Sequence, residues 1–227
     1  MNRTEFSSLD AAGLNLQAVF DLSALPAELR ATLDPQGRHR RLLLIGHGGR
    51  RLWERVKVAG LASEHPIDEF TVAAVREWFA AQLPGSGYAL LYPGDAPVGL
   101  QALGRLAGWH HESPFRVGVN AEWGSWFAYR AVALTDADLP PSAPLAGASP
   151  CASCAARPCV TACPAGALAG DDFSLPKCIA YRRQPESRCR ITCVARTRCP
   201  VRPEHRYDDD QIAHSYSRSL AMIEKFY

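Results

Sequence analysis

The first 150 residues of this 227-residue chain contain no cysteine, and no part of the chain has a long hydrophobic run. A helix needs about 20 apolar residues to cross a bilayer, and no segment approaches that length. The opening residues, MNRTEFSSLDAAGLN, place no apolar segment behind a basic residue, so we see no secretory signal. We therefore expect a cytoplasmic protein without a membrane partner, in a compartment where thiols stay reduced unless a metal binds them.

The net charge is also low: its formal value is +2, which by itself predicts no strongly charged binding partner. The 47% hydrophobic and 21% charged composition is typical of a folded globular chain rather than a disordered one. The distribution of charge is uneven. The stretch 182–206 contains eight arginines and only two glutamates. The arginines are at positions 182, 183, 188, 190, 196, 198, 202 and 206.

Apolar segments of strand length alternate with helix-like segments over the first 140 residues. Predicted strands are 41–46 (RLLLIG), 88–94 (YALLYPG), 115–119 (FRVGV) and 126–136 (WFAYRAVALTD). Predicted helices are 51–58, 65–85, 98–108 and a terminal one within 207–227. This alternation predicts an α/β layer with a mixed sheet, and we find no internal repeat.

The segment 139–150, LPPSAPLAGASP, contains four prolines in twelve positions. Such a segment is an extended connector because each proline restricts both itself and the residue before it. We therefore expect two domains, residues 1–140 and residues 141–227.

All eight cysteines lie between positions 151 and 199 and fall into two sets by sequence. The first set has the pattern C-x2-C-x4-C-x3-C-P and comprises Cys151, Cys154, Cys159 and Cys163. The second set has the pattern C…C-x3-C-x5-C-P and comprises Cys178, Cys189, Cys193 and Cys199. The bacterial ferredoxin run is C-x2-C-x2-C-x3-C-P, whose fourth cysteine ligates the other cluster. The first set differs from it by two extra residues. The repeated Cys-Pro ending and the count of eight favour two 4Fe–4S clusters.

Other thiol chemistries also fit this spacing. Four-cysteine zinc sites use similar intervals, an even count suits disulfides in an oxidising compartment, and buried free thiols are a third alternative. The arginines support the clusters, because guanidinium groups offset the negative charge of a thiolate-bound iron–sulfur core. Their alternative interpretation is a solvated basic face. A nucleic-acid partner is not expected, since few aromatic residues are interleaved with them.

Three further features have both a functional and a structural interpretation. His110 and His111 follow a glycine-containing turn, and they are either an acid or cobalt ligand or ordinary loop residues. The GHGG segment 46–49 either presents amides to a phosphate or makes a tight turn. An aromatic cluster either packs between the α/β layer and the cysteine-rich domain or forms a wall for a flat cofactor; it comprises Trp123, Trp126, Phe127 and Tyr129.

The stretch GSWFAYRAVALTDADLPPSAP…CASC…CVTACPAGAL…KCIAYR…C…C…CP resembles the iron–sulfur half of epoxyqueuosine reductase, a cobalamin-dependent enzyme of transfer-RNA modification. It is still more similar to short bacterial ferredoxin-like proteins with the x4 spacing and a GCxARxxCP ending, compared with TCVARTRCP here. The match covers residues 122–207, and all eight thiols find counterparts. The upstream segments LIGHGGRRLWERV, HPIDEF and LGRLAGW are similar to the short group with weaker motifs.

The resemblance implies an α+β fold, with a nitroreductase-like α/β layer followed by a small ferredoxin-like double-cluster domain. It implies that cluster one uses Cys151, Cys154, Cys159 and Cys199. It implies that cluster two uses Cys163, Cys178, Cys189 and Cys193. In the reductase the first layer cradles cobalamin, for which the candidate contacts here are His110, Trp123, Trp126 and Tyr129.

The chain departs from the reductase pattern in two places. The segment GLQALGRLAGWHH has no carboxylate where the family carries an aspartate acid, and Asp95 lies far upstream. The sequence ends at Tyr227, so we expect the C-terminal helical repeats of the reductase to be missing. We therefore expect an electron-transfer protein with two 4Fe–4S clusters and a redox partner protein. The alternative is a cobalamin-dependent reductase whose clusters reduce a bound corrinoid, and a third, weaker hypothesis is a sensor of redox state or oxygen.

Overall fold

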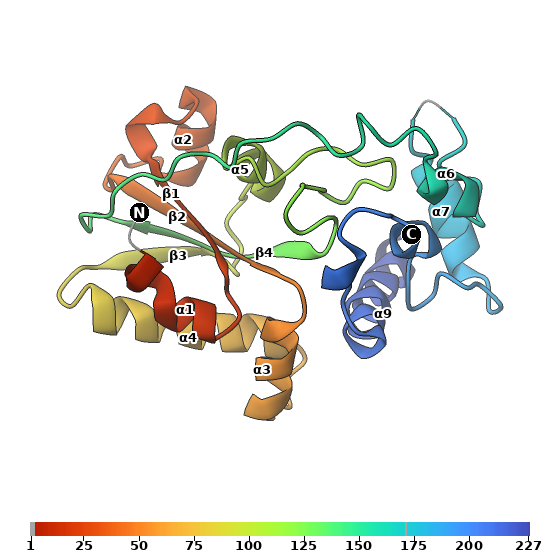
Figure 1. Ribbon diagram of the computed structural model, residues 1–227. Helices are drawn as coiled ribbons and strands as arrows, with labels where there is room; N and C mark the ends of the chain where they lie inside the picture. The colour runs from red at the N-terminus through yellow and green to blue at the C-terminus, as the bar shows by residue number, and fades with distance from the viewer. Residues whose placement is uncertain (1–2, 171) are drawn as a thin grey trace. The chain divides into compact units, whose positions relative to one another are not determined.

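The computed structural model describes residues 3–170 and 172–227 (Figure 1). It forms two compact units: Met1–Trp109 with Phe127–Ala146, and His110–Trp126 with Gly147–Tyr227. The first unit contains a four-stranded sheet with helices, and the second contains the cysteines, so the α+β class is confirmed. No helix in the described part of the chain combines the length and apolarity that crossing a bilayer requires. The domain division at residue 140 stays a prediction.

The sheet of the first unit is antiparallel throughout, with the strand order β1-β2-β4-β3. Its strands are β1 (Leu16–Asp21), β2 (Arg41–Gly48), β3 (Tyr88–Tyr92) and β4 (Phe127–Thr135). The expected mixed sheet is wrong for these strands. The helical crossover does return β3 parallel to β2, but β4 lies between them and pairs antiparallel with both.

Two strand predictions differ from the structure. Residues 115–119 form no strand: only Val119 makes an isolated bridge, to His111. Arg116 has a φ of 60°, which is incompatible with extended backbone. Conversely, β1 was not predicted, although it pairs with β2 along its whole length.

The predicted helices of the first unit are confirmed as α3 (Arg51–Ala59), α4 (Pro66–Gln82) and α5 (Leu100–Leu106). In α4, proline occupies the first turn, where its missing N–H is harmless, and Asp68 and Glu69 lie at the positive end of the helix dipole. The shorter helical segments are η1 (Arg3–Phe6), α1 (Ser7–Ala11), η2 (Leu22–Ala24) and α2 (Ala27–Leu33).

The core of the first unit lies between the sheet and the helices α1, α3 and α4. Val75, Trp78 and Phe79 of α4 are buried in the same cluster as Leu43 of β2 and Ala133 of β4. Figure 1 shows α1 and α4 on one side of the sheet and α2 and α5 on the other. Alternate residues of the central strands therefore face helices on both sides, which explains why β2 is buried along nearly its whole length.

The second unit is built from short helices joined by loops. These elements are α6 (Pro158–Ala162), α7 (Leu175–Arg183), α8 (Val194–Thr197), η3 (Pro203–His205) and α9 (Asp209–Phe226). The terminal helix prediction is confirmed by α9. Helix α6 packs on α8, and α7 packs on α9. The apolar clusters are small, and one of them includes the side chains of Cys159 and Cys199.

Candidate functional site

Four cysteines line one cavity of about 310 Å³ in the second unit. Two come from the loop before α6, one from α6 itself and one from the residues after α8: Cys151, Cys154, Cys159 and Cys199. The packing of α6 on α8 brings the last two together despite their separation in sequence.

The other four cysteines line a second cavity of about 160 Å³. They lie directly after α6, within α7, in the loop that follows α7, and at the N-terminal cap of α8: Cys163, Cys178, Cys189 and Cys193. Cys163 and Cys199 are thus exchanged between the two sequence sets. This is the grouping that the resemblance implied, although the binding of clusters at these thiols stays a prediction.

Burial raises the pKa of five of these thiols, and nearby cysteines of the same cavity add to the effect at all five, Cys151, Cys159, Cys178, Cys189 and Cys199. Only the thiolate binds a metal. Binding of metal at either cavity must therefore release protons.

All eight thiols are free of disulfide bonds. The backbone N–H of Arg196 donates to Sγ of Cys193 at 3.4 Å, so a sulfur of the second cavity accepts an amide hydrogen bond. In a zinc site the sulfurs lie about 2.3 Å from one ion. Within the described residues, no group of three His, Cys, Asp or Glu side chains converges on one point in that way.

Two of the eight arginines are buried in the second unit, and one of them lines a cavity. Arg182 donates from Nε to the carbonyl of Cys189 at 3.0 Å, and it lines the second cavity. Arg196 places its guanidinium over the ring of Trp126, with 4.5 Å to the ring centroid, and it donates to the carbonyl of Ser125. These two side chains were not distinguished in the sequence, because an arginine's burial depends on the fold around it.

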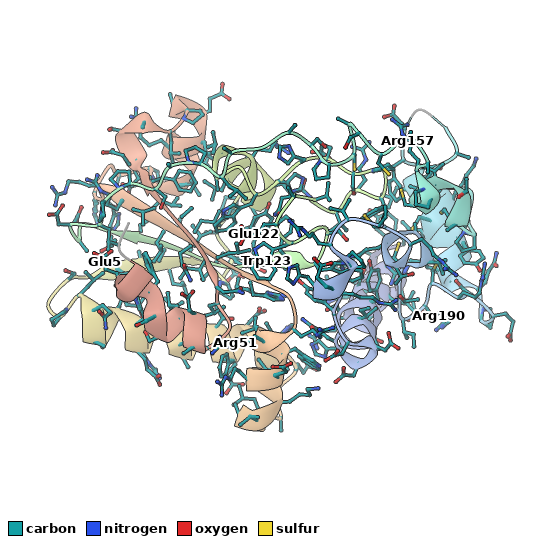
Figure 2. The ribbon with its side chains drawn as sticks, viewed as in Figure 1. Glu5, Arg51, Glu122, Trp123, Arg157 and Arg190 are labelled. Carbon is teal, nitrogen blue, oxygen red and sulfur yellow. The ribbon has the colours of Figure 1, made fainter. Side chains whose placement is uncertain are left out.

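The remaining arginines of the basic stretch lie nearer the surface. Arg190 pairs with Glu224 at 3.6 Å and Arg206 with Asp209 at 3.1 Å. Figure 2 shows Arg190 at the outer edge of the second unit, like Arg157 near the first cavity. The exposed members of the stretch are Arg183, Arg188, Arg198 and Arg202. For these four the solvated-face interpretation is confirmed.

The aromatic cluster expected near residue 126 is divided between the two units. In the second unit, Trp123 contacts the ring of His205 at 4.5 Å, and Trp126 contacts Tyr207 at 5.4 Å. In the first unit, Tyr129 of β4 stacks on Trp109 at 6.4 Å.

The histidines and the glycine segment have local roles. His110 is buried, and its Nε2 lies 3.6 Å from a carboxylate oxygen of Glu112. His111 forms the backbone bridge to Val119. In the GHGG segment, residues 46–48 end β2, and Gly49, with a φ of 72°, makes the tight turn that leads into α3.

One buried polar group in the sheet unit was not predicted from the sequence. His47 is fully buried, and its Nδ1 accepts a hydrogen bond from Nε of Arg130 at 2.9 Å. Burial raises the pKa of nearby Tyr92, and the charge of Arg130 opposes this. This contact could not be predicted from the sequence, because His47 and Arg130 become neighbours only once β2 is known to pair with β4.

Neither a family model nor a curated protein sequence matches the chain. Solved structures do match. An epoxyqueuosine reductase in complex with an epoxyqueuosine-modified tRNA-Tyr stem loop superposes with a TM-score of 0.58 at 14% identity, covering 93% of this chain and 68% of that one. Epoxyqueuosine reductase from Bacillus subtilis superposes with a TM-score of 0.57 at 14% identity, covering 91% of this chain and 66% of that one. The Streptococcus thermophilus enzyme superposes with a TM-score of 0.54 at 13% identity, covering 88% of this chain and 66% of that one. The chain spans about two thirds of the length of these reductases, and over most of its own length it is similar to them in fold.

Proposed function

We propose that the second unit is a ferredoxin-like module that holds two 4Fe–4S clusters. The first cluster is bound by Cys151, Cys154, Cys159 and Cys199. The second cluster is bound by Cys163, Cys178, Cys189 and Cys193. The observation that carries this proposal is the placement of four thiols around each of two separate cavities. An amide donor to sulfur and buried arginines fit an anionic cluster as well.

We further propose that the protein is an oxidoreductase of the corrinoid-dependent class, in which the clusters relay single electrons to a bound corrinoid. A free electron carrier needs only the second unit, whereas the similarity to epoxyqueuosine reductases extends over the sheet unit as well. This favours the reductase over the plain electron-transfer protein. A reduced corrinoid supplies a strongly reducing cobalt centre when bound.

In this proposal the first unit is a nitroreductase-like layer that helps to hold the corrinoid. Of the candidate contacts that the resemblance implies, Tyr129 belongs to the first unit, whereas His110, Trp123 and Trp126 belong to the second. Of these, Trp123 and Tyr129 are half-buried and have ring surface to offer, whereas His110 and Trp126 are buried. A redox partner protein supplies the electrons.

The clusters are tested by anaerobic iron and sulfide analysis with an absorption spectrum. We expect about eight irons per chain and a broad visible band that dithionite bleaches. A colourless protein containing zinc would overturn the cluster proposal.

Binding of a corrinoid is tested by titrating the cluster-loaded protein with cobalamin and monitoring the absorption spectrum. We expect saturable spectral shifts that are weakened in Trp123→Leu but not in the control Tyr227→Leu, because Tyr227 is 69% exposed. Loaded clusters without any cobalamin binding would return the plain electron-transfer function to first place.

A further inference from the structure

Among the described residues, two buried guanidinium groups in the second unit have no carboxylate to balance them. Arg182 is 6% exposed and Arg196 is 7% exposed. Within the described part of the chain, neither forms an ion pair with an aspartate or glutamate, although six other arginines do. A buried charge is costly unless an opposite charge and hydrogen bonds compensate it.

The groups that surround Arg182 are neutral and hold it in one position. Its Nη1 donates to Oγ of Ser219 at 3.0 Å, and its Nη2 donates to the carbonyl of Tyr216 at 2.8 Å. The guanidinium carbon also lies 5.4 Å from the centroid of the Tyr216 ring. These contacts satisfy the N–H groups, but they do not cancel the positive charge.

Arg196 is enclosed in the same way. Its guanidinium lies over Trp126 at 4.5 Å and over Tyr207 at 5.2 Å from the ring centroids. Its only described carbonyl acceptor is that of Ser125, and its Nε has no hydrogen-bond partner within the described residues. The charge is therefore fixed in a dry environment, where its field is strong.

The two arginines differ in which cysteines they border. Arg182 bonds the carbonyl of Cys189 and lines only the second cavity. Arg196 borders both groups through its backbone: its N–H donates to Sγ of Cys193 at 3.4 Å, and its carbonyl accepts a hydrogen bond from the N–H of Cys199 at 3.1 Å. The position of α8, which joins these two cysteines, explains this double contact.

We propose that Arg182 and Arg196 are built-in counter-charges for the clusters, with Arg182 serving the second cluster alone and Arg196 serving both. This inference rests on the proposed function, because the missing negative charge is the cluster itself. Each added electron makes a cluster more negative, so a fixed positive charge beside it favours reduction and raises its potential. Arg196, shared between the sites, also offsets the repulsion between two reduced clusters.

The test is a redox titration of the loaded protein followed by electron paramagnetic resonance, which resolves two reduction steps. In Arg182→Gln we expect one step to become harder by about tenfold, which is 59 mV for one electron. In Arg196→Gln we expect both steps to move in that direction. The control is Arg188→Gln, which removes an exposed charge next to Cys189 and leaves both steps unchanged because water screens it.

Iron and sulfide are measured on every variant first. A wild-type protein without clusters would remove the proposed function and this inference together. Loaded clusters whose potentials do not respond to Arg182→Gln, or respond equally to Arg188→Gln, would overturn this inference alone. If a glutamine variant fails to bind its clusters, the same measurements are made on Arg182→Lys and Arg196→Lys, which keep the positive charge. Lysine variants that bind clusters with nearly unchanged reduction potentials support the role of charge. Lysine variants that fail to bind clusters contradict it, because the shape of the guanidinium is then what the site needs.

Discussion

Cys163 and Cys199 each lie in the cavity whose other three cysteines belong to the opposite sequence set. The crossed grouping makes a prediction about pairs of substitutions. The double variant Cys151→Ser/Cys199→Ser removes two ligands of one cluster and should keep about half of the iron. Cys151→Ser/Cys163→Ser damages both clusters and should lose most of it.

The measurement is iron and labile sulfide per chain after anaerobic purification. Pairing in sequence order would give the reverse result, with the half-loaded protein coming from the variant that lacks Cys151 and Cys163. The two double variants serve as controls for each other, since each lacks two thiols.

Asp34 is a second residue whose role can be measured. Burial alone would raise its pKa, but hydrogen bonds from the backbone amides of His39 and Arg38 outweigh burial and hold the pKa below its ordinary 3.8. The ionised form is therefore stabilising above about pH 4, and this contribution is lost as the pH falls through the lowered value.

We expect Asp34→Asn to lower the free energy of unfolding by about 1 kcal/mol at neutral pH. The deficit relative to wild type should shrink towards pH 3, because the wild-type carboxyl then becomes protonated. Thermal or urea unfolding at a series of pH values measures this. A deficit that is independent of pH would contradict the assigned hydrogen bonds.

At this scale the sequence was informative about chemistry and silent about burial. The spacing of the cysteines predicted that the thiols gather in two groups of four, because that pattern is local, and the binding of clusters by these groups stays a prediction. The burial of Arg182 and Arg196 was not predictable, since the eight arginines look alike in the sequence until α7, α8 and α9 place two of them inside.

Helix α5 depends on one glycine where it approaches the sheet. A Cβ on Gly104 would overlap the hydroxyl group and ring of Tyr129 in β4. We expect Gly104→Ala to destabilise the protein by about 1–3 kcal/mol, although alanine is the better helix former. Gly87→Ala is the control, because nothing lies within 4 Å of its Cβ position.

Chemical unfolding of both variants gives the comparison. Equal stabilities would mean that Tyr129 moves aside at no cost. In that event the ring would be loosely held, and its packing on Gly104 would not fix its position.

Individual elements were more predictable than their arrangement. The amphipathic pattern, the proline in the first turn and the terminal Pro84-Gly85 were sufficient to predict α4. The antiparallel sheet was not predictable from the alternation of strands and helices, because β4 is inserted between β2 and β3 from far along the chain. The position of β1 was missed because polar residues, Gln17 and Asp21, interrupt its apolar run.

The two units should differ in their dependence on the clusters. The first has a core built on the sheet, whereas the small core of the second includes the thiols of Cys159 and Cys199 themselves. Binding of a metal group to a site that the unfolded chain lacks contributes directly to folding. We therefore expect removal of the clusters to unfold the second unit and to leave the first folded.

Hydrogen exchange measured by mass spectrometry, before and after anaerobic cluster removal, tests this difference. Amides of α7 and α9 should lose protection, while those of β2 and β4 should keep it. Protection that persists in both units would show that the second unit folds without its clusters.

The backbone passes from one unit to the other three times, at Trp109, Phe127 and Ala146. This order has a consequence during translation. A ribosome releases β1, β2 and β3 first, and β2 and β3 have no partner between them until the segment 110–126 has also emerged and β4 has followed it. Residues 110–126 belong to the second unit, whose remaining residues, 147–227 with the cysteines, are translated later still. The nascent sheet therefore closes only after part of the other unit has been made, so neither unit can be completed vectorially on its own.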